Sequence, residues 1–444
     1  MDADVIVIGA GAAGIAAARA LHDSQNDALV IDARDRIGGR VFTHRSPGVT
    51  TAIELGAEFI HGRAVPLDKT LRAAALTTVD ISGSRWQSTR THLHPFNDFW
   101  ERLERVMRLL PGRRGPDRSF QEFISARPGG SRLAAERTSA LQYVESFHAA
   151  DPRLISAQVL ADAGSPGDDE RERRIGRVLG GYDRVIEWMA APLDGRIRLS
   201  AVVTRVRWRP GRVVVDVQQP DGRDRESIES RAAIITVPLG VLKASPGERG
   251  AIEFSPPLSQ KRDALDHLAV GSVVRVAFLF AERFWAEEWF AKRVRSDAFD
   301  RCSFIHTHDP HFPVWWTAYP LLEPVMVAWS GGLRSHELSG RTPEQIQSQA
   351  IASLARVLHV PQRRIESLVA GAWMHDWEHD PFARGAYSYQ MVGGSDAPKR
   401  LARPIQRTLF FAGEASDAEG STGTVHGAIA TGQRAAAQVL RVLR

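Results

Sequence analysis

The chain has 444 residues, 43% hydrophobic and 25% charged, which is typical of a soluble globular protein and long enough for two domains. No apolar run reaches the roughly 18 residues of a membrane-spanning helix, and a strand pattern that begins by Val5 leaves no room for a secretory leader, so we expect neither. The formal net charge is +5, but the basic residues alternate with 52 acidic ones along the chain, which argues against binding to nucleic acid.

Residues 4–40 predict a strand, a glycine turn, a helix of small residues and a second strand. The turn, GAGAAG, fits the G-x-G-x-x-G motif of dinucleotide-binding βαβ units. In that motif Gly9 permits the tight turn, Gly11 lets the backbone approach a pyrophosphate, and Gly14 lets helix and strand pack closely. The N-terminus of the helix attracts phosphate, and Asp32 at the end of the second strand can accept hydrogen bonds from a ribose.

Helices, loops and strands alternate through the rest of the chain. Residues 66–175 are polar and rich in arginine, with a helix predicted in 96–110 and loops at 111–116, 126–130 and 164–170. Further on, the pattern predicts a helix in 180–193, strands in 197–208, 212–219, 232–240, 269–280 and 324–332, a helix in 343–360, a strand in 407–416 and a helix in 423–443.

The residues that follow Asp32 resemble the flavoproteins of the glutathione-reductase-like superfamily. Arg34-Asp35-Arg36-Ile37-Gly38-Gly39-Arg40 is similar to their E-x-x-x-x-x-G-G-R continuation, with Asp32 in place of the usual Glu. The paired glycines let the backbone come close to the cofactor, and Arg40 can pair with its phosphates.

Motifs in the middle and at the end of the chain extend this resemblance to the flavin amine oxidase family. That family includes monoamine and polyamine oxidases, L-amino-acid oxidases and flavin histone demethylases. The matching blocks stand in the family's order: residues 54–62 (ELGAEFIHG), 180–183 (GGYD), 236–242 (TVPLGVL), 377–389 (WEHDPFARGAYSY), 411–414 (FAGE) and 423–428 (GTVHGA).

This resemblance implies FAD as the cofactor. It is expected to be noncovalent, because Ala386 stands where monoamine oxidases carry a cysteine joined to the flavin. Asp32 and Arg34 are expected at the adenosine ribose, with the backbone of Val203 at the adenine. The full predicted set of FAD contacts is Gly9, Gly11, Gly14, Asp32, Ala33, Arg34, Gly39, Arg40, Gly56, Ala57, Glu58, Phe59, Val203, Trp377, Gly413, Glu414, Thr424 and Val425.

The same resemblance indicates an aromatic wall beside the flavin ring. Tyr387 occupies one aromatic position, where its electron-rich face can hold an amine. The partner position is Tyr in monoamine oxidases but Thr424 here, so a wider or longer substrate is expected. His61 matches an active-site histidine of animal polyamine oxidases, although a structural role is the alternative. His426 is expected to be structural.

Arg275 interrupts the apolar strand predicted over residues 269–280 (AVGSVVRVAFLF). Alternation places it on the face opposite Val276 and Phe278. In the family the corresponding lysine holds a water against the flavin N5 atom, but Arg stays charged and presents a broader fork. Our hypothesis is that Arg275 faces the flavin, where it holds a water, binds a substrate carboxylate or pairs with an acid such as Glu58. The alternative is an edge-strand arginine with its head in solvent.

The combined prediction is an α/β fold that carries an FAD-dependent amine oxidase. The FAD-binding Rossmann domain, of the glutathione-reductase-like type, comprises residues 1–65, 172–258 and 373–444. Two insertions, 66–171 and 259–372, form an α+β substrate-binding domain.

The predicted reaction oxidises a primary or secondary amine, including polyamine-like amines, to an imine, with oxygen as acceptor and hydrogen peroxide as product. The alternatives are an L-amino-acid oxidase, which needs an arginine for the substrate carboxylate, and a flavin-binding protein without oxidase activity. A dehydrogenase of cyclic hydrocarbons or porphyrinogens shares the N-terminal motif, but the blocks at 385–389 and 423–427 argue against it.

Cys302 is the single cysteine of the chain, which excludes an internal disulfide and a cysteine-based metal cluster. We therefore expect a cytoplasmic protein and no metal site. The expected partners are a small amine and molecular oxygen.

Overall fold

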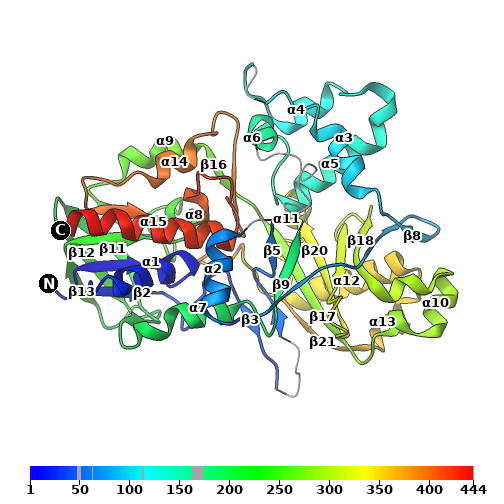
Figure 1. Cartoon of the computed structure of the whole chain (residues 1–444), viewed down its shortest axis with the longest axis horizontal. Helices are drawn as coiled ribbons and strands as arrows, with labels where there is room; N and C mark the ends of the chain where they lie inside the picture. Colours follow the sequence, from blue (N-terminus) through cyan, green and yellow to red (C-terminus); the bar gives the residue numbers. More distant parts are fainter. Residues whose placement is uncertain (48–51, 63, 113–114, 163–173, 444) are drawn as a thin grey trace.

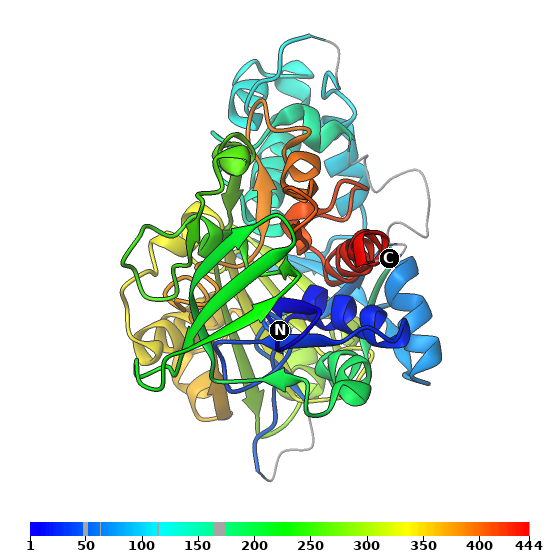
Figure 2. The same ribbon diagram turned by 90° about the vertical axis from the view of Figure 1, so that its left-hand side faces the viewer.

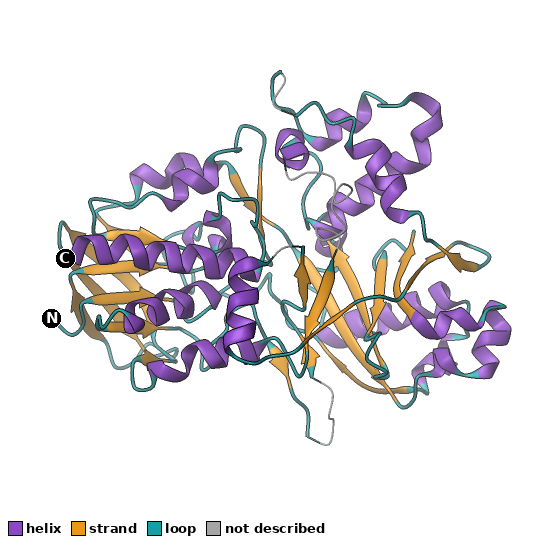
Figure 3. Cartoon of the chain, viewed as in Figure 1, coloured by secondary structure: helices purple, strands orange, loops and turns teal. Residues whose placement is uncertain are grey.

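The computed structural model describes residues 1–47, 52–62, 64–112, 115–162 and 174–443. Two layered bodies lie side by side, with a group of helices above the right-hand one (Figure 1). Each body is built on a β-sheet that helices cover on one face, as the distribution of helix and strand in Figure 3 shows.

The first body contains a five-stranded parallel sheet with neighbouring strands in the order β10, β2, β1, β14, β23. The strands are β10 (Ile197–Arg198), β2 (Ala28–Ile31), β1 (Val5–Ile8), β14 (Ala232–Ile235) and β23 (Leu409–Phe411). The four longer strands are apolar and buried throughout, as expected of a parallel sheet covered on both faces. The sheet therefore joins the beginning, middle and end of the chain.

Helices cover one face of this sheet. They are α1 (Ala12–Asp23), α2 (Val65–Ala73), α7 (Asp183–Ala190) and α15 (Val425–Leu443). The red α15 lies against the blue α1 in Figures 1 and 2, although the two stand at opposite ends of the sequence. Their backbones approach so closely that a Cβ added to Gly432 would lie 2.1 Å from the carbonyl oxygen of Ala13.

A four-stranded sheet covers the other face, in the order β13, β12, β11, β15. Its strands are β13 (Glu226–Ser230), β12 (Arg212–Gln218), β11 (Val202–Arg209) and β15 (Glu253–Ser255). Figure 2 shows this sheet in green, in front of the parallel strands. The β11–β12 hairpin is the antiparallel pair that the sequence predicts. Val206 and Val215 alternate inward from it and pack against Ile6 of β1.

The second body is built on a seven-stranded sheet, in the order β21, β17, β20, β19, β18, β7, β8. The strands are β21 (Val369–Trp373), β17 (Val273–Phe280), β20 (Val325–Gly331), β19 (Val314–Thr317), β18 (Cys302–Thr307), β7 (Ser84–Ser88) and β8 (Leu93–Pro95). Both insertions contribute to it, since β7 and β8 come from the first and the remaining strands from the second.

The two faces of this sheet pack against different apolar clusters, as the side chains of β17 show. Val276 and Phe278 pack into an aromatic core under the helices α10 (Glu288–Val294), α12 (Pro343–Leu358) and α13 (Gln362–Glu366). Ala277 belongs to a smaller apolar cluster on the opposite face. The predicted alternation is thus confirmed, and it places Arg275 on the face turned away from the helices.

A separate helical group consists of α3 (Phe99–Met107), α4 (Phe120–Ser125), α5 (Ala134–Phe147) and α6 (Ala157–Asp162). In α3 the residues Phe99, Leu103 and Val106 fall on one face and are buried in the core of this group. This group lies above the seven-stranded sheet in Figure 1.

Short elements connect the bodies. β5 (Phe59–His61) pairs with β9 (Ile175–Val178), which also pairs with β6 (Thr78–Asp80). β16 (Leu268–Val270) pairs with β22 (Ser388–Gln390), and β3 (Thr43–His44) with β4 (Ile53–Glu54). The remaining helices are α8 (Leu239–Leu242), α9 (Arg262–Asp266), α11 (Leu333–His336) and α14 (Ala397–Ala402).

The predicted α/β fold is confirmed, but three predicted strands differ from those observed. The strand predicted over 197–208 is divided into β10 and β11, and that over 269–280 into β16 and β17, each pair in two different sheets. The strand predicted over 232–240 ends at Ile235, before α8 begins at Leu239. The predicted helix in 343–360 begins with a capping box between Thr342 and Gln345, with Pro343 at its first position. The loop predicted at 164–170 lies outside the described residues, as do residues 113 and 114 of the loop at 111–116.

We propose to keep the predicted domain division with one change. The prediction gives 1–65, 172–258 and 373–444 to the FAD-binding part, and 66–171 and 259–372 to the substrate-binding part. Leu67 and Leu71 of α2 lie in the core of the first body, so we move this helix to the FAD-binding part, whose first segment then ends at Ala73. The boundary at 171/172 lies outside the described residues.

Replacement of Gly432 by alanine tests the close packing of α15 on α1. Helix propensity alone favours alanine by about 1 kcal/mol. Overpacking against the Ala13 carbonyl costs about 1–3 kcal/mol, so we expect Gly432→Ala to lower the thermal unfolding midpoint. Gln433→Ala, at an exposed site of the same helix, is the control. A higher midpoint for Gly432→Ala would show that the two helices are not packed this closely.

Candidate active site

One large cavity, with a volume of about 1310 Å³, is bordered by residues of both bodies. Gly9, Asp32, Thr236 and Gly413 line it, and they follow the carboxyl ends of β1, β2, β14 and β23. Ligands of open parallel sheets bind at this edge. The volume exceeds the roughly 300–1,000 Å³ of common ligand sites, so a dinucleotide and a second molecule fit together.

Every predicted site residue lines this cavity except Gly14. A Cβ on Gly14 would lie 1.8 Å from the carbonyl oxygen of Gly9. Gly14 therefore allows the helix to pack on the turn, which is the role predicted for the third glycine of the motif.

The turn between β1 and α1 has the features that a diphosphate requires. Gly9 has a φ of +111°, which favours glycine, and a Cβ on Gly39 would lie 3.2 Å from the Cα of Gly11. No side chain caps the N-terminus of α1, so its first N–H groups are available to a ligand. These features fit the phosphates of FAD.

Asp32 lies at the end of β2 with 6% of its surface exposed. Its two carboxylate oxygens accept hydrogen bonds from the N–H groups of Ala10 (2.6 Å) and Arg34 (2.8 Å). Burial raises the pKa of Asp32, and these two hydrogen bonds oppose that effect. The Arg34 side chain turns to Asp380, with 2.7 Å between Nη2 and Oδ2. The ribose contacts of Asp32 and Arg34 stay predictions.

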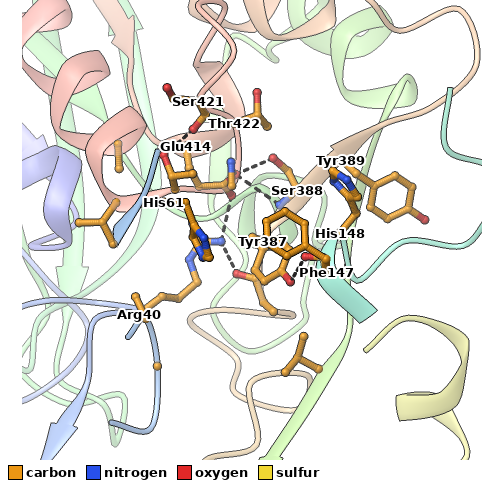
Figure 4. Close-up of a pocket in the computed structure, with 18 of the residues that line it drawn as sticks. Arg40, His61, Phe147, His148, Tyr387, Ser388, Tyr389, Glu414, Ser421 and Thr422 are labelled. Carbon is orange, nitrogen blue, oxygen red and sulfur yellow. Dashed lines mark hydrogen bonds and ion pairs between the residues drawn. The ribbon is translucent and has the colours of Figure 1, made fainter. Parts of the chain in front are cut away.

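Arg40 and Glu414 form an ion pair inside the cavity (Figure 4). Arg40 Nη1 lies 2.9 Å from Glu414 Oε1 and donates to the carbonyl oxygen of Ala386 at 2.5 Å. The other oxygen of Glu414 accepts hydrogen bonds from the Ser388 hydroxyl (2.6 Å) and the Gly423 N–H (3.0 Å). Because these contacts use only Nη1 of Arg40, the phosphate contact predicted for Arg40 remains geometrically open.

Arg275 is buried, with 4% of its side chain exposed, and is bonded to Glu58. β17 lies between β21 and β20, so the alternative of an edge-strand arginine in solvent is wrong. Arg275 Nη1 donates to the carbonyl oxygen of Gly56 at 2.8 Å, and Nε has no hydrogen-bond partner among the described residues.

A second buried arginine, Arg177 of β9, shares Glu58. Its Nε lies 2.6 Å from Glu58 Oε1, and its remaining nitrogens donate to the carbonyl oxygens of residues 317–319. Trp316 Nε1 also donates to Glu58, at 3.1 Å. Burial would raise the pKa of Glu58, but the charges of Arg275 and Arg177 outweigh it and lower that pKa. Glu58 is therefore ionised, and the Arg177–Glu58–Arg275 triad carries one net positive charge.

Tyr387 and His61 both lie beside Phe147, the last residue of α5 (Figure 4). The Tyr387 hydroxyl donates to the carbonyl oxygen of Phe147 at 2.7 Å. The ring of Phe147 lies edge-on to His61, with 5.3 Å between centroids, and stacks on Tyr143 at 4.9 Å. Burial lowers the pKa of His61 to about 4, with a smaller contribution from His426. His61 is thus a neutral imidazole at neutral pH.

Two further residues hold the loops around the cofactor region. Trp377 Nε1 donates to the carbonyl oxygen of Leu55 at 2.9 Å. Thr424 Oγ1 accepts a hydrogen bond from the Gly427 N–H at the start of α15, so its hydroxyl belongs to the helix terminus. His426 is buried in the first turn of α15, in agreement with the structural role expected for it.

Sequence reasoning missed Arg177, Trp316 and Phe147. Arg177 stands in the short strand IGRV, and a charge in such a strand is the same signal that singled out Arg275. Trp316 and Phe147 carry no local signal, because aromatic residues in a strand or an amphipathic helix usually belong to a core.

The described residues include no group of three or more His, Cys, Asp or Glu side chains arranged for a metal ion. None of the helices that the structure describes has the length and apolar character needed to cross a membrane.

Comparison with known proteins identifies the family. The family model described as flavin containing amine oxidoreductase matches residues 12–440. Polyamine oxidase 2 from Arabidopsis thaliana is 30% identical, in an alignment that covers 97% of this chain and 87% of the relative. The chain therefore belongs to the flavin-containing amine oxidoreductases, its cofactor is FAD, and the resemblance read from the motifs is confirmed.

Two solved structures share the fold. Putrescine oxidase, wild type bound to putrescine, has a TM-score of 0.79 at 22% identity, covering 99% of both chains. Cyclohexylamine oxidase from Brevibacterium oxydans IH-35A has a TM-score of 0.80 at 19% identity, covering 100% of both chains.

The buried carboxyl of Glu54 predicts a pH dependence of stability. Burial raises its pKa to about 7, against the lowering effect of hydrogen bonds from the Tyr182 N–H and the Thr43 hydroxyl. An unfolded glutamate titrates near pH 4.3, so between about pH 4.3 and pH 7 the folded state binds the extra proton. Stability contributed by this group is therefore lost as the pH rises through that window.

We expect Glu54→Gln to flatten the decline of the thermal unfolding midpoint between about pH 5 and pH 7. The exposed Glu226, replaced by Gln, is the control. An unchanged pH slope in Glu54→Gln would contradict the assignment.

Proposed function

We propose that this flavin amine oxidoreductase oxidises a primary or secondary amine of polyamine-like shape to an imine, with dioxygen as the acceptor and hydrogen peroxide as the product. The observation that carries the proposal is the continuity of one cavity from the glycine turn at Gly9, past Arg275 and Tyr387, to the aromatic side chains of the helical group. Such a cavity brings a long, slender molecule end-on to the cofactor.

Bound FAD supplies the acceptor for a hydride from the carbon next to the amine nitrogen. The amine also loses the nitrogen proton, the resulting imine is hydrolysed by water, and dioxygen takes two electrons and two protons to become hydrogen peroxide. We propose that Ala386 leaves the cofactor noncovalent. The backbone at Gly11 and the N-terminus of α1 are proposed to hold its diphosphate, and Asp32 and Val203 its adenosine.

The side chains around the cavity favour the neutral form of the amine and orient it. Only a neutral amine can lose a hydride readily, and enclosure among Phe147, Tyr143 and Tyr387 disfavours the protonated form by removing water. His61 is neutral at the working pH, so it adds no charge and can share a hydrogen bond with the amine. We propose Tyr387 and His61 as the residues that orient the substrate.

The Arg177–Glu58–Arg275 triad supplies a permanent positive charge. Its net positive charge is buried, so it disfavours a cationic amine nearby and stabilises negative charge that develops next to it. Arg275 also lines the cavity, so its guanidinium charge acts on whatever the cavity binds. We propose Arg275 as the residue that takes the place of the family's lysine.

The polyamine-like class is supported by two findings. The relative described above is a polyamine oxidase, and a fold neighbour was solved with putrescine bound. The alternative of an L-amino-acid oxidase finds no support at Arg275, because its two terminal nitrogens already bind Glu58 and the Gly56 carbonyl.

We also propose that the protein works in the cytoplasm and binds no nucleic acid. Cys302 is buried and unpaired, which suits a reducing compartment. The surface arginines of the described residues commonly pair with neighbouring acids, for example Arg205 with Glu253 and Arg212 with Glu229, which leaves few of them to bind phosphate.

Anaerobic mixing of the holoenzyme with amines and amino acids tests the proposal. We expect polyamine-like amines to bleach the flavin absorbance and admission of oxygen to restore it with release of hydrogen peroxide. Bleaching by amino acids alone would favour the L-amino-acid oxidase. Absence of bleaching by every compound would contradict both activities and leave a flavin-binding protein.

A further inference from the structure

Arg85 lies in the part of the cavity farther from the glycine turn, on β7 of the seven-stranded sheet. Its guanidinium carbon lies 5.1 Å from the ring centroid of Phe304, 5.2 Å from Trp100 and 5.8 Å from Phe99. The cation is therefore surrounded by aromatic side chains. Burial lowers its pKa to about 10, so Arg85 is still charged at neutral pH.

The charge of Arg85 has no counter-ion in the part of the chain that the structure describes. Its side chain makes no hydrogen bond and no ion pair there, although a guanidinium carries five N–H donors. The fully buried Arg275 and Arg177 differ in this respect, since both bind Glu58. Arg85 is half-buried, and a guanidinium with so little contact with water favours an anion that enters the cavity.

His306 provides a second unsatisfied polar group at the same place. Its ring stacks on Phe99 with 4.4 Å between centroids, and its side chain makes no hydrogen bond among the described residues. Burial and the nearby charge of Arg85 lower the pKa of His306 to about 3, so the ring is neutral. A neutral imidazole can donate one N–H, and His306 lines the cavity.

We propose that Arg85 and His306 form an anion subsite for the far end of the substrate, which therefore carries a carboxylate at the end opposite to the oxidised amine. The guanidinium takes the carboxylate in its fork, and the imidazole N–H adds a further donor. This inference rests on the proposed amine oxidase function and narrows its substrate class.

The position of Arg85 in the sheet separates this subsite from the cofactor. Residues paired in successive strands lead from Arg85 through Phe304, Trp316 and Val327 to Ala277 of β17. Four strand spacings of about 4.8 Å place the two ends of this row roughly 19 Å apart. The Arg85 side chain reaches back over Phe304, so a bound carboxylate lies closer to the amine site than this Cα separation.

The charge of Arg85 also disfavours an unmodified polyamine in this part of the cavity. The second ammonium of a polyamine would lie among aromatic side chains beside the like charge of Arg85, and no carboxylate of the described residues is bonded to Arg85 to offset that charge. An amine whose far nitrogen is converted to an amide by a dicarboxylic acid avoids this repulsion and presents a terminal carboxylate. We therefore identify the substrate class as diamines that are N-acylated by a dicarboxylic acid.

Three substrates of one diamine, which differ in far-end charge, test the subsite: putrescine, N-acetylputrescine and N-succinylputrescine. The series is repeated on longer diamines, and the best length is compared. We expect the holoenzyme to show the highest kcat/KM with the succinyl compound. In Arg85→Gln, the ratio of kcat/KM for the succinyl compound to that for the acetyl compound should fall at least about tenfold.

Two variants control this measurement. Arg85→Lys keeps the cation and should restore most of the ratio, whereas a purely structural loss would lower both values together. Arg90→Gln, at an exposed site just after β7, should leave the ratio unchanged. A holoenzyme that prefers the acetyl compound or the free diamine at every length overturns the subsite, as does an unchanged ratio in Arg85→Gln.

Binding of N-ethylsuccinamate, which has the amide and carboxylate but no amine, separates the two proposals. Isothermal titration of the holoenzyme should give a Kd at least about tenfold weaker in Arg85→Gln. Arg85-dependent binding without oxidation of any amine supports the subsite and contradicts the amine oxidase. Oxidation of amines with a Kd that does not depend on Arg85 supports the oxidase and overturns the subsite.

Discussion

The attachment of two buried arginines to the carboxylate of Glu58 is the interaction on which the site depends. Glu58 stands just before β5, Arg177 on β9, which pairs with β5, and Arg275 on a central strand of the seven-stranded sheet. The triad therefore joins β5 and β9 to the seven-stranded sheet. An unpaired charge at any of these three positions would be expensive, so the arrangement holds the parts in one relative position.

The two ends of the cavity differ in how their positive charges are paired. Near the cofactor, two cations and one carboxylate leave a single positive charge, fixed by hydrogen bonds to Trp316 and to backbone carbonyls. At the other end, Arg85 has aromatic neighbours, and no carboxylate of the described residues is bonded to it. The intervening wall is aromatic, with Phe59, Trp316 and Phe304 in mutual contact. An elongated substrate that is neutral in its middle suits this layout.

Local physical rules predicted the turn and the first two strands at the cofactor end of the cavity, whereas the other FAD contacts were implied by the family resemblance and stay predictions. The glycine turn, the acid at the end of the second strand and the helix between them depend on residues close together in the sequence. Alternation along β17 likewise predicted the face on which Arg275 lies. Glu58 entered the prediction as one of several options for pairing with Arg275, and only the tertiary structure brings the two into contact.

The rest of the site depends on strand register, which the sequence pattern did not reveal. Arg85 and Phe304 become neighbours because β7 and β18 pair in parallel across more than 200 residues of chain, and Trp316 joins them through β19. Arg85 stands in the polar strand SRWQS, and no local feature separates it from the surface arginines of a chain whose 57 basic residues include only five lysines. Only the burial of an arginine and the identity of its neighbours distinguish it from the surface arginines, and both depend on the tertiary structure.

A double-mutant cycle of Arg177→Met and Arg275→Met measures the triad most directly. The free energy of unfolding of the holoprotein is compared among the wild type, both single variants and the double variant. Glu58 keeps one cation in each single variant and none in the double variant, so we predict that the double loss exceeds the sum of the single losses by more than about 1 kcal/mol. Losses that add to within about 0.5 kcal/mol would contradict a shared carboxylate as the constraint that holds the site together.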